Sequence, residues 1–442
     1  MNIREKTTII INELNAKLIE REHVVPIILL TLFSRSHMLL LGPPGVGKTY
    51  AIELIRYFIK ELKYFEYLIT NNTTLDELFG TKVVDADGNM VYNIEHSMLD
   101  SHLCFVDELY KAPSSLTNSL LGITHSSRSF YQRGRGKLKS PMISMFAASN
   151  ELPENDTADA FDDRILLRFW IDEIKDTENF KRFAKRDFDM TKKFSVSFDL
   201  TELADINEES KKIFIHDDFV AIYSDIRTKL GTEKVRISDR KLQSSLDIFQ
   251  ASAYINGRAQ VELSELFLLL DIAWKHHDDI DRVRRIVFDL IFGNPSNVLD
   301  VLKSNQDSYK VIQSQLRGQV GNVLNYSYNF HGVNAESEFI QNRDFIQQIC
   351  DNTQVVNSNC NSIKDNYAFA ITMERAIEEN IFLMNYKNHV YHSEDSVGEK
   401  RVNKDDVFTL SSDVSMLMNK LTAWLDKTTG LYEYNNEKID RK

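Results

Sequence analysis

The segment 42–49, GPPGVGKT, constrains the fold of this chain more than any other. It matches the pattern G-x-x-x-x-G-K-[ST]. The apolar run 38–41 before it predicts a buried strand, and a helical pattern follows it. Between a strand and a helix such a loop wraps a phosphate, because its N–H groups point inward and the helix adds a positive dipole end; the alternative is a chance glycine turn. The expected nucleotide-binding residues are Gly42, Pro43, Pro44, Gly45, Val46, Gly47, Lys48 and Thr49.

Short apolar runs at 67–69, 103–106 and 143–147 predict the other strands of the same sheet. Helical patterns separate these runs along the chain. Strands that alternate with helices indicate an α/β fold with a parallel sheet and right-handed crossovers. The helices expected in this region are 3–19, a stretch after Pro26, 51–63 and 114–123.

After about residue 195 the strand signals fade, and apolar residues recur at spacings of three and four. We therefore expect an α/β core at 1–195, an all-helical domain at 196–300 and a mainly helical extension at 301–442. The helices expected in the second domain are 208–230, 238–255, 262–276 and 279–292. In the Asn- and Ser-rich extension we expect helices near 365–385 and 411–426 and a short strand at 407–410.

Composition narrows the class of protein. The 442 residues include 53 Lys+Arg and 65 Asp+Glu, a net charge of −12, which disfavours binding to nucleic acid through overall charge. The three cysteines lie far from any His-rich tract, which argues against a disulfide scaffold or a zinc site. No apolar run reaches the ~18 residues of a membrane span, and the N-terminus lacks the apolar segment of a secretion signal. We expect a soluble, cytoplasmic protein.

Four polar residues follow the predicted strands and point to phosphate chemistry. Lys48 would neutralise the β- and γ-phosphates, and the Thr49 hydroxyl would bind Mg²⁺. Asp107 and Glu108 end the strand 103–106; on an extended chain they point to opposite sides, so Asp107 could serve the metal and Glu108 could deprotonate a water. A charge pair at a helix N-terminus is the alternative.

Asn150 closes the strand after the one that carries Glu108. Its uncharged amide could hydrogen-bond the γ-phosphate or position the water without adding negative charge. A lone asparagine at a strand end is more often a turn residue.

The order Lys48–Thr49, Asp107–Glu108 and Asn150 resembles that of AAA+ ATPases, with Asn150 in the sensor-1 place. The segments LLLGPPGVGKT, FVDELYKA, AASNELPE and DDRILLRFW are similar to the MoxR family, and within it to the RavA (regulatory ATPase variant) branch. The resemblance covers roughly residues 1–290. It implies an AAA+ core with a helical lid, ATP and Mg²⁺ as ligands, and a ring of subunits, expected to be a hexamer.

The resemblance also implies roles for three further residues. Arg164 would be the arginine finger that reaches the neighbouring subunit's γ-phosphate, with Arg168 as the less favoured candidate, and Arg240 would be the sensor-2 residue of the lid. His23 would line the adenine pocket. From the residues alone, a solvated or internally paired arginine is the more common role for Arg164 and Arg168. Arg240 lies just past a helix start that Ser238 could cap, and it could face the nucleotide cleft or be an exposed first-turn arginine.

Two segments have the composition of surface inserts. The stretch 81–97, with a turn signal at 85–89, predicts a β-hairpin and resembles the helix-2 insert of MoxR proteins. The stretch 128–139 gathers Arg128, Arg133, Arg135, Lys137 and Lys139; it could face a pore or an anionic partner, or be a solvated loop.

The resemblance implies a Mg²⁺-dependent ATPase that remodels or activates a partner protein. For MoxR-type ATPases the usual partner is a separate chain with a von Willebrand factor A (vWA) domain, and the task is chaperone-like maturation or metal insertion. Relatives in the RavA branch carry an inserted β-rich domain beyond the lid, which we cannot place in 306–442. The alternatives are a nucleic-acid motor or loader, for which 128–139 is the support, and an ATP-gated scaffold with little turnover.

Overall fold

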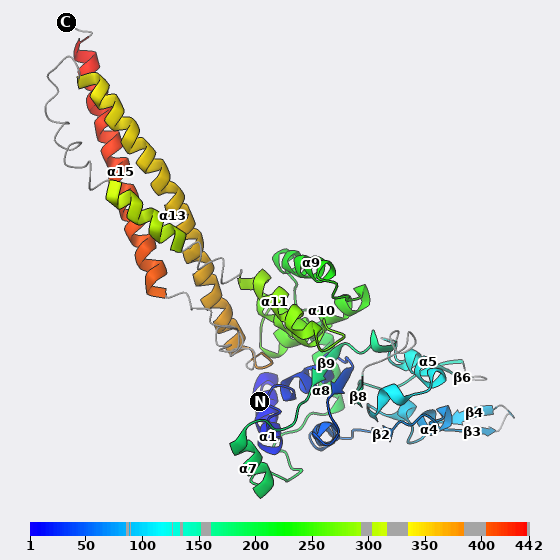
Figure 1. Ribbon diagram of the computed structural model, residues 1–442. Coiled ribbons are helices and arrows are strands. Elements are labelled where there is room, and N and C mark those ends of the chain that lie inside the picture. The colour runs from blue at the N-terminus through cyan, green and yellow to red at the C-terminus, as the bar shows by residue number, and fades with distance from the viewer. Residues whose placement is uncertain are drawn as a thin grey trace. The chain divides into compact units, whose positions relative to one another are not determined.

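The computed structural model describes residues 1–84, 88, 90–125, 127–132, 136–151, 161–292, 303–315, 335–383 and 404–439 (Figure 1). The chain forms two compact units. Unit 1 consists of Met1–Val287 and Ala376–Val390, and unit 2 of Phe288–Arg375 and Tyr391–Lys442. Most of the turn predicted at 85–89, together with Arg133, Arg135 and the end of the AASNELPE segment, lies outside the described residues.

Within the described residues, a five-stranded sheet in the order β2-β5-β8-β1-β9 forms the centre of unit 1, and its strands run parallel. The three inner strands are apolar and buried, as expected for strands covered on both faces. The predicted α/β fold with a parallel sheet is confirmed. The strands are β1 (Met38–Leu41), β2 (Tyr64–Leu68), β5 (Leu103–Asp107), β8 (Ser144–Ser149) and β9 (Leu167–Trp170).

Helices lie before, between and after these strands. Helix α1 begins with a capping box between Asn2 and Glu5, and all nine residues of α2 are buried. The helices of this part are α1 (Ile3–Lys17), α2 (Val25–Phe33), α3 (Lys48–Glu53), α4 (Leu75–Phe79), α5 (Ser114–Ile123) and α7 (Thr177–Lys185), with 3₁₀ turns η1 (Leu54–Tyr57), η2 (Met98–Asp100) and η3 (Leu109–Lys111).

Three predictions for the core are wrong in detail. The helix expected at 51–63 begins at Lys48, because the phosphate loop leads directly into it, and ends as a 3₁₀ turn at Tyr57. Strand β2 occupies 64–68 rather than 67–69; it is a partly exposed edge strand, so Glu66 interrupts its apolar pattern. Strand β9 was not predicted, because Arg168 breaks the apolar run that would have indicated a buried strand.

The two predicted surface segments are both β-hairpins. Strands β3 (Thr81–Val84) and β4 (Met90–Asn93) pair antiparallel, which confirms the hairpin at 81–97. The basic stretch is also a hairpin, formed by β6 (Ser129–Gln132) and β7 (Gly136–Lys139), rather than a loop.

Arg128 faces neither a pore nor solvent. It is buried, contacts His37 and the Arg35 carbonyl, and donates at 3.3 Å to the Thr124 and Ile143 carbonyls. Burial lowers its pKa to about 9. This arginine therefore ties the β6–β7 hairpin to the core.

A helical region follows the sheet in unit 1. Our single helix at 208–230 is wrong: the chain leaves one helix at Ser210, and His216 caps a new one by accepting from the Asp218 N–H. The stretch predicted as a helix at 262–276 is a 3₁₀ helix. The elements are α8 (Leu200–Ser210), α9 (Asp217–Thr232), α10 (Asp239–Ile255), η4 (Leu263–Asp271) and α11 (Asp279–Phe292), of which the part from Phe288 onward belongs to unit 2.

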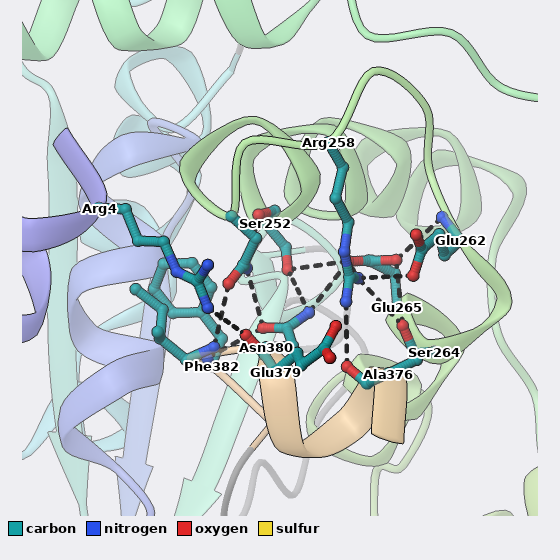
Figure 2. Close-up of polar contacts among 12 residues, drawn as sticks. Arg4, Ser252, Arg258, Glu262, Ser264, Glu265, Ala376, Glu379, Asn380 and Phe382 are labelled. Carbon is teal, nitrogen blue, oxygen red and sulfur yellow. Dashed lines mark hydrogen bonds and ion pairs between the residues drawn. The ribbon is translucent and has the colours of Figure 1, made fainter. Parts of the chain in front are cut away.

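Residues 376–383 return to this helical region from far along the chain. Figure 2 shows Asn380 beside Ser252 and Glu265, with Arg258 bonded to the same carboxylate. Arg258 also donates to the Ala376 carbonyl at 3.0 Å. A fully buried polar network therefore anchors this short segment within unit 1.

Unit 2 contains helix 303–315 and two long helices, α13 (Ala335–Glu379, of which the last turn belongs to unit 1) and α15 (Lys404–Ile439). Both are much longer than the helices predicted at 365–385 and 411–426, because polar residues between the buried positions hide the pattern. The strand expected at 407–410 is wrong, since these residues are helical. The residues buried between the helices are Ile312, Ile346, Ile349, Cys350, Val356, Cys360, Ile363, Leu410, Val414 and Leu421.

No helix in the described ranges is both long and apolar enough to span a membrane.

Candidate active site

The phosphate loop requires glycine at three positions. A Cβ on Gly42 would lie 2.1 Å from the Ile171 carbonyl oxygen, so the loop could not pass β9 with a larger residue. Gly45 and Gly47 have φ of 84° and 85°, in the left-handed region. Gly47 is also the N-cap of α3. The backbone therefore forms a cradle at a helix N-terminus, which fits a phosphate group.

Lys48 lies at the centre of this cradle. Its Nζ donates to the carbonyl oxygens of Gly42 at 2.6 Å and Pro43 at 2.9 Å, and to the Asn150 side chain at 2.7 Å. Burial lowers the pKa of Lys48, while the charges of Asp107 and Glu108 act to raise it. The ammonium group is thus held over the loop by oxygen atoms.

Glu108 leaves the strand direction at the end of β5. Its φ is 56°, so our expectation of an extended chain at Asp107–Glu108 is wrong at Glu108. The Glu108 N–H donates to Asp107 Oδ1 at 2.9 Å, which stabilises the turn. Glu108 Oε1 accepts from Asn150 Nδ2 at 2.8 Å. The turn therefore directs the carboxylate toward the end of β8.

Asn150 joins the predicted cation and the predicted base. Its Oδ1 accepts from Lys48, and its Nδ2 donates to Glu108. The strand order explains this contact, because β8 lies between β5 and β1 and places Asn150 between the residues that follow those strands. Thr49 follows Lys48 in the chain and Asp107 precedes Glu108; their hydroxyl and carboxylate oxygens are the kinds of ligand that Mg²⁺ prefers.

The two finger candidates have different surroundings. Arg168 is 1% exposed and forms an ion pair with Asp162, so it is not available to another chain in this structure. Arg164 is half-buried, and its guanidinium donates to the Leu121 carbonyl; the Nε atoms of both arginines are buried without a hydrogen-bond partner. Burial and the charge of Arg240 lower the pKa of Arg164.

Arg240 lies in the first turn of α10. Ser238 is the N-cap of this helix and accepts from the Lys241 N–H, as we predicted. The Arg240 side chain is 54% exposed and pairs with Asp163 at 3.0 Å. Arg164 donates to the Leu121 carbonyl, and Arg240 donates to Asp163. Among the described residues, these hydrogen bonds do not reach the Lys48–Asn150–Glu108 group.

His23 lies at a cavity of about 460 Å³. Its ring is 5.0 Å from that of Phe169 on β9. The cavity brings together the segment before α2, strand β9 and the helical region, and its volume suits a planar ligand of nucleobase size. The lining residues are Glu22, His23, Arg168, Phe169, Trp170, Leu270, Asp271, Trp274, Ile280 and Arg284.

Sequence reasoning missed Arg21. This buried arginine donates from Nη2 to the carbonyls of Val46 in the phosphate loop and Asp172 after β9, both at 2.9 Å. It therefore fixes the loop to the segment that follows the neighbouring edge strand β9. Its neighbours lie 25 and 151 residues away, so no local pattern indicates the contact.

Comparisons with known proteins agree with this geometry. Residues 5–207 match the family model described as the MoxR domain in the MoxR-vWA-beta-propeller ternary systems, and residues 218–287 match the AAA lid domain. Protein MJ0079 of Methanocaldococcus jannaschii is 34% identical over 72% of this chain and 83% of its own length; MJ0812 of the same organism is 33% identical over 63% and 74%. A crystal structure from Cytophaga hutchinsonii, described as a candidate ATPase, aligns with a TM-score of 0.54 at 17% identity over 66% of this chain and 95% of its own.

Proposed function

Because the chain belongs to the MoxR family of AAA+ ATPases, we propose that it binds and hydrolyses ATP with Mg²⁺ and uses the energy to remodel or activate a partner protein. The observation that carries this proposal is the Lys48–Asn150–Glu108 group. A cation, an amide and a carboxylate meet where three neighbouring parallel strands end, beside a loop shaped for phosphate.

Each residue of this group has a role in phosphoryl transfer to water. Lys48 and the N–H groups of loop 42–49 would hold the β- and γ-phosphates. Glu108 would accept a proton from the attacking water. The water oxygen bonds to the γ-phosphorus as the bond between the γ-phosphorus and the bridging oxygen breaks. Asn150, bonded to both groups, would orient the water. Thr49 and Asp107 would hold Mg²⁺, which neutralises phosphate charge when bound.

We extend the proposal to a ring, expected to be a hexamer, in which one subunit completes the site of the next. Arg164 would be the finger, since Arg168 is committed to Asp162 inside its own chain. Arg240 would sense the nucleotide from the lid, from its exposed position at the start of α10. The cavity at His23 would hold the adenine. The three-part division into core, lid and extension remains our proposal for the domains.

The partner we propose is a protein with a vWA domain in a separate chain, with a chaperone-like outcome. The matching family model describes MoxR domains of systems that include vWA and beta-propeller proteins. Placement in the RavA branch rests on the four similar segments. The described residues from 303 onward are helical and include no β-rich insert, so unit 2 differs from what that branch implies.

The alternatives have less support. A nucleic-acid motor depended on the basic stretch 128–139, and Arg128 of that stretch is buried in the core. An ATP-gated scaffold would not need a carboxylate positioned by the sensor asparagine, as Glu108 is by Asn150.

Phosphate release by the purified chain tests the proposal. We expect turnover that requires Mg²⁺, is indifferent to DNA, and falls about 10²–10⁴-fold in Glu108→Gln while ATP binding persists. Glu66→Gln, the same change on the exposed edge strand β2, is the matched control and should hydrolyse ATP at the parent rate. Equal and negligible rates for the parent and Glu108→Gln would favour the scaffold, and stimulation by DNA would favour the motor.

A further inference from the structure

A buried aspartate connects the turn that carries Glu108 with the turn that carries Arg164. Tyr110, two residues after Glu108, donates from its hydroxyl to Asp162 Oδ1 at 2.6 Å. Asp162 lies two residues before Arg164 and is 4% exposed. The proposed base and the proposed finger of one subunit are therefore joined by a single side-chain hydrogen bond between two short turns.

Asp162 is held as a charged acceptor. Its other carboxylate oxygen is paired with the buried Arg168. Burial acts to raise the pKa of Asp162, but Arg168, Lys241 and the Tyr110 hydrogen bond together lower it. A charged acceptor makes the Tyr110 hydrogen bond stronger than one between neutral groups.

The helical region approaches Asp162 and the next residue, Asp163. Arg240 pairs with Asp163, and the next residue, Lys241, is buried. Burial and the charge of Arg168 lower the pKa of Lys241 to about 7, although Asp162 and Asp163 act to raise it. Residues 162–164 thus contact the Glu108 turn, because Asp162 bonds Tyr110, and they contact α10, because Asp163 pairs with Arg240. The third residue of this segment is the finger candidate Arg164.

The Tyr110–Asp162 hydrogen bond lies between two groups of the proposed reaction. Each end of the Tyr110–Asp162 bond lies within two residues of a group that we assign to the reaction, and the bond is a direct polar connection between their turns. When charge at Glu108 changes during hydrolysis, a displacement of η3 would move Tyr110, and with it the turn that holds Arg164.

From this geometry we infer that Tyr110 and Asp162 are positioning residues that couple the state of Glu108 in one subunit to the finger which that subunit offers its neighbour. The inference rests on the proposed function. It makes hydrolysis at neighbouring sites of a ring dependent on each other, a property that can be separated from the activity of a single site.

The test is a subunit-mixing experiment with the full chain. Parent subunits are mixed with increasing fractions of Glu108→Gln subunits, and phosphate release is measured at saturating ATP and Mg²⁺. Coupled sites give a loss of activity steeper than the fraction of inactive subunits. Tyr110→Phe removes the hydroxyl and keeps the ring. When both components carry this change, we expect the loss of activity to become proportional to the fraction of inactive subunits. In a titration of ATP, we expect the Hill coefficient to fall toward one.

Two further variants control the experiment. Tyr64→Phe removes a hydroxyl that donates to the Glu66 carboxylate at 3.0 Å, remote from these turns, and should keep the steep curve. Asp162→Asn keeps an acceptor for the Tyr110 hydroxyl but loses the charge that strengthens this hydrogen bond, so its curve should lie between the steep parent curve and the proportional curve of Tyr110→Phe.

Three outcomes overturn the inference in distinguishable ways. A parent without ATP turnover removes the proposed function and the coupling together. A parent that hydrolyses ATP but loses activity in simple proportion to inactive subunits has no coupling to transmit. A steep parent curve that is unchanged by Tyr110→Phe, or is flattened equally by Tyr64→Phe, removes the coupling role alone and leaves the proposed function intact.

Discussion

Unit 1 contains two polar clusters, each built around an asparagine, and they differ in how completely their polar atoms are paired. In the helical region, Asn380 donates to Ser252 and Glu265 and accepts from the Asn256 amide and the Phe382 N–H (Figure 2). Asn380 and Glu265 are both 0% exposed. Every hydrogen-bonding position of the Asn380 side chain is therefore used within the chain.

In the proposed nucleotide site, Asn150 joins a cation to a carboxylate, and this carboxylate remains partly open. The Glu108 side chain is 18% exposed, and Lys48 is bonded mainly to loop carbonyls, which a phosphate can replace. A closed cluster resists exchange because each lost partner leaves a buried polar group unpaired. The same residue type thus fixes a structure in one place and can serve chemistry in the other.

The largest effect is expected at the open cluster. Lys48→Ala removes the ammonium group that the cradle holds, so ATP binding should fall below detection. The fold should persist, because the partners that Lys48 leaves are neutral oxygens of the loop and of Asn150 rather than a buried charge. Binding of a fluorescent ATP analogue measures the loss, and the melting temperature without nucleotide tests the fold. Lys60→Ala, which removes an exposed ammonium group outside the site, is the control and should retain binding.

The second prediction concerns the finger. Arg164→Ala should lower turnover about 10³-fold or more, and mixing it with Glu108→Gln subunits should restore part of the activity, because some interfaces then hold an intact Glu108 and an intact finger. Arg168→Ala should instead lower stability, since it leaves Asp162 without its buried partner. Phosphate release across mixing ratios is the measurement. Absence of recovery in assemblies shown to contain both variants would argue against a shared site.

The third prediction concerns the closed cluster around Asn380. Asn380→Leu leaves Glu265, Ser252 and Asn256 with unfilled positions in a buried site, so the free energy of unfolding should fall by about 1–3 kcal/mol for each group left unpaired. Urea unfolding measures the change. Asn71→Leu at an exposed turn is the control and should change stability little. A fall no larger than that of the control would mean that the network does not stabilise this region.

The difference between the clusters also explains what the sequence could predict. Strands β1, β5 and β8 are short apolar runs, and the residues that end them carry the site, so periodicity and motif order place Lys48, Glu108 and Asn150 together. Asn380 and Ser252 are 128 residues apart, and neither belongs to a local pattern. The left-handed turn at Glu108 and the salt-bridged strand β9 depend likewise on tertiary contacts, which a single sequence does not display.

The smallest effect is expected from pH, and it acts on the closed cluster. Burial raises the pKa of Glu265 to about 7, despite its ion pair with Arg258 at 2.7 Å. Because this folded-state pKa lies above the usual glutamate value of 4.5, the folded protein binds the proton more tightly than the unfolded chain does. The stabilisation is fully present below about pH 4.5 and is lost as pH rises to about 7. Glu265→Gln should therefore flatten the dependence of unfolding free energy on pH in this window, measured by urea unfolding, whereas Glu262→Gln on the partly exposed end of η4 should not. If the unfolding free energy of Glu265→Gln depends on pH as steeply as that of the parent, the Glu265 carboxylate is ionised in the folded protein throughout this window. The charge of Arg258 would then lower the pKa of Glu265 by more than burial raises it.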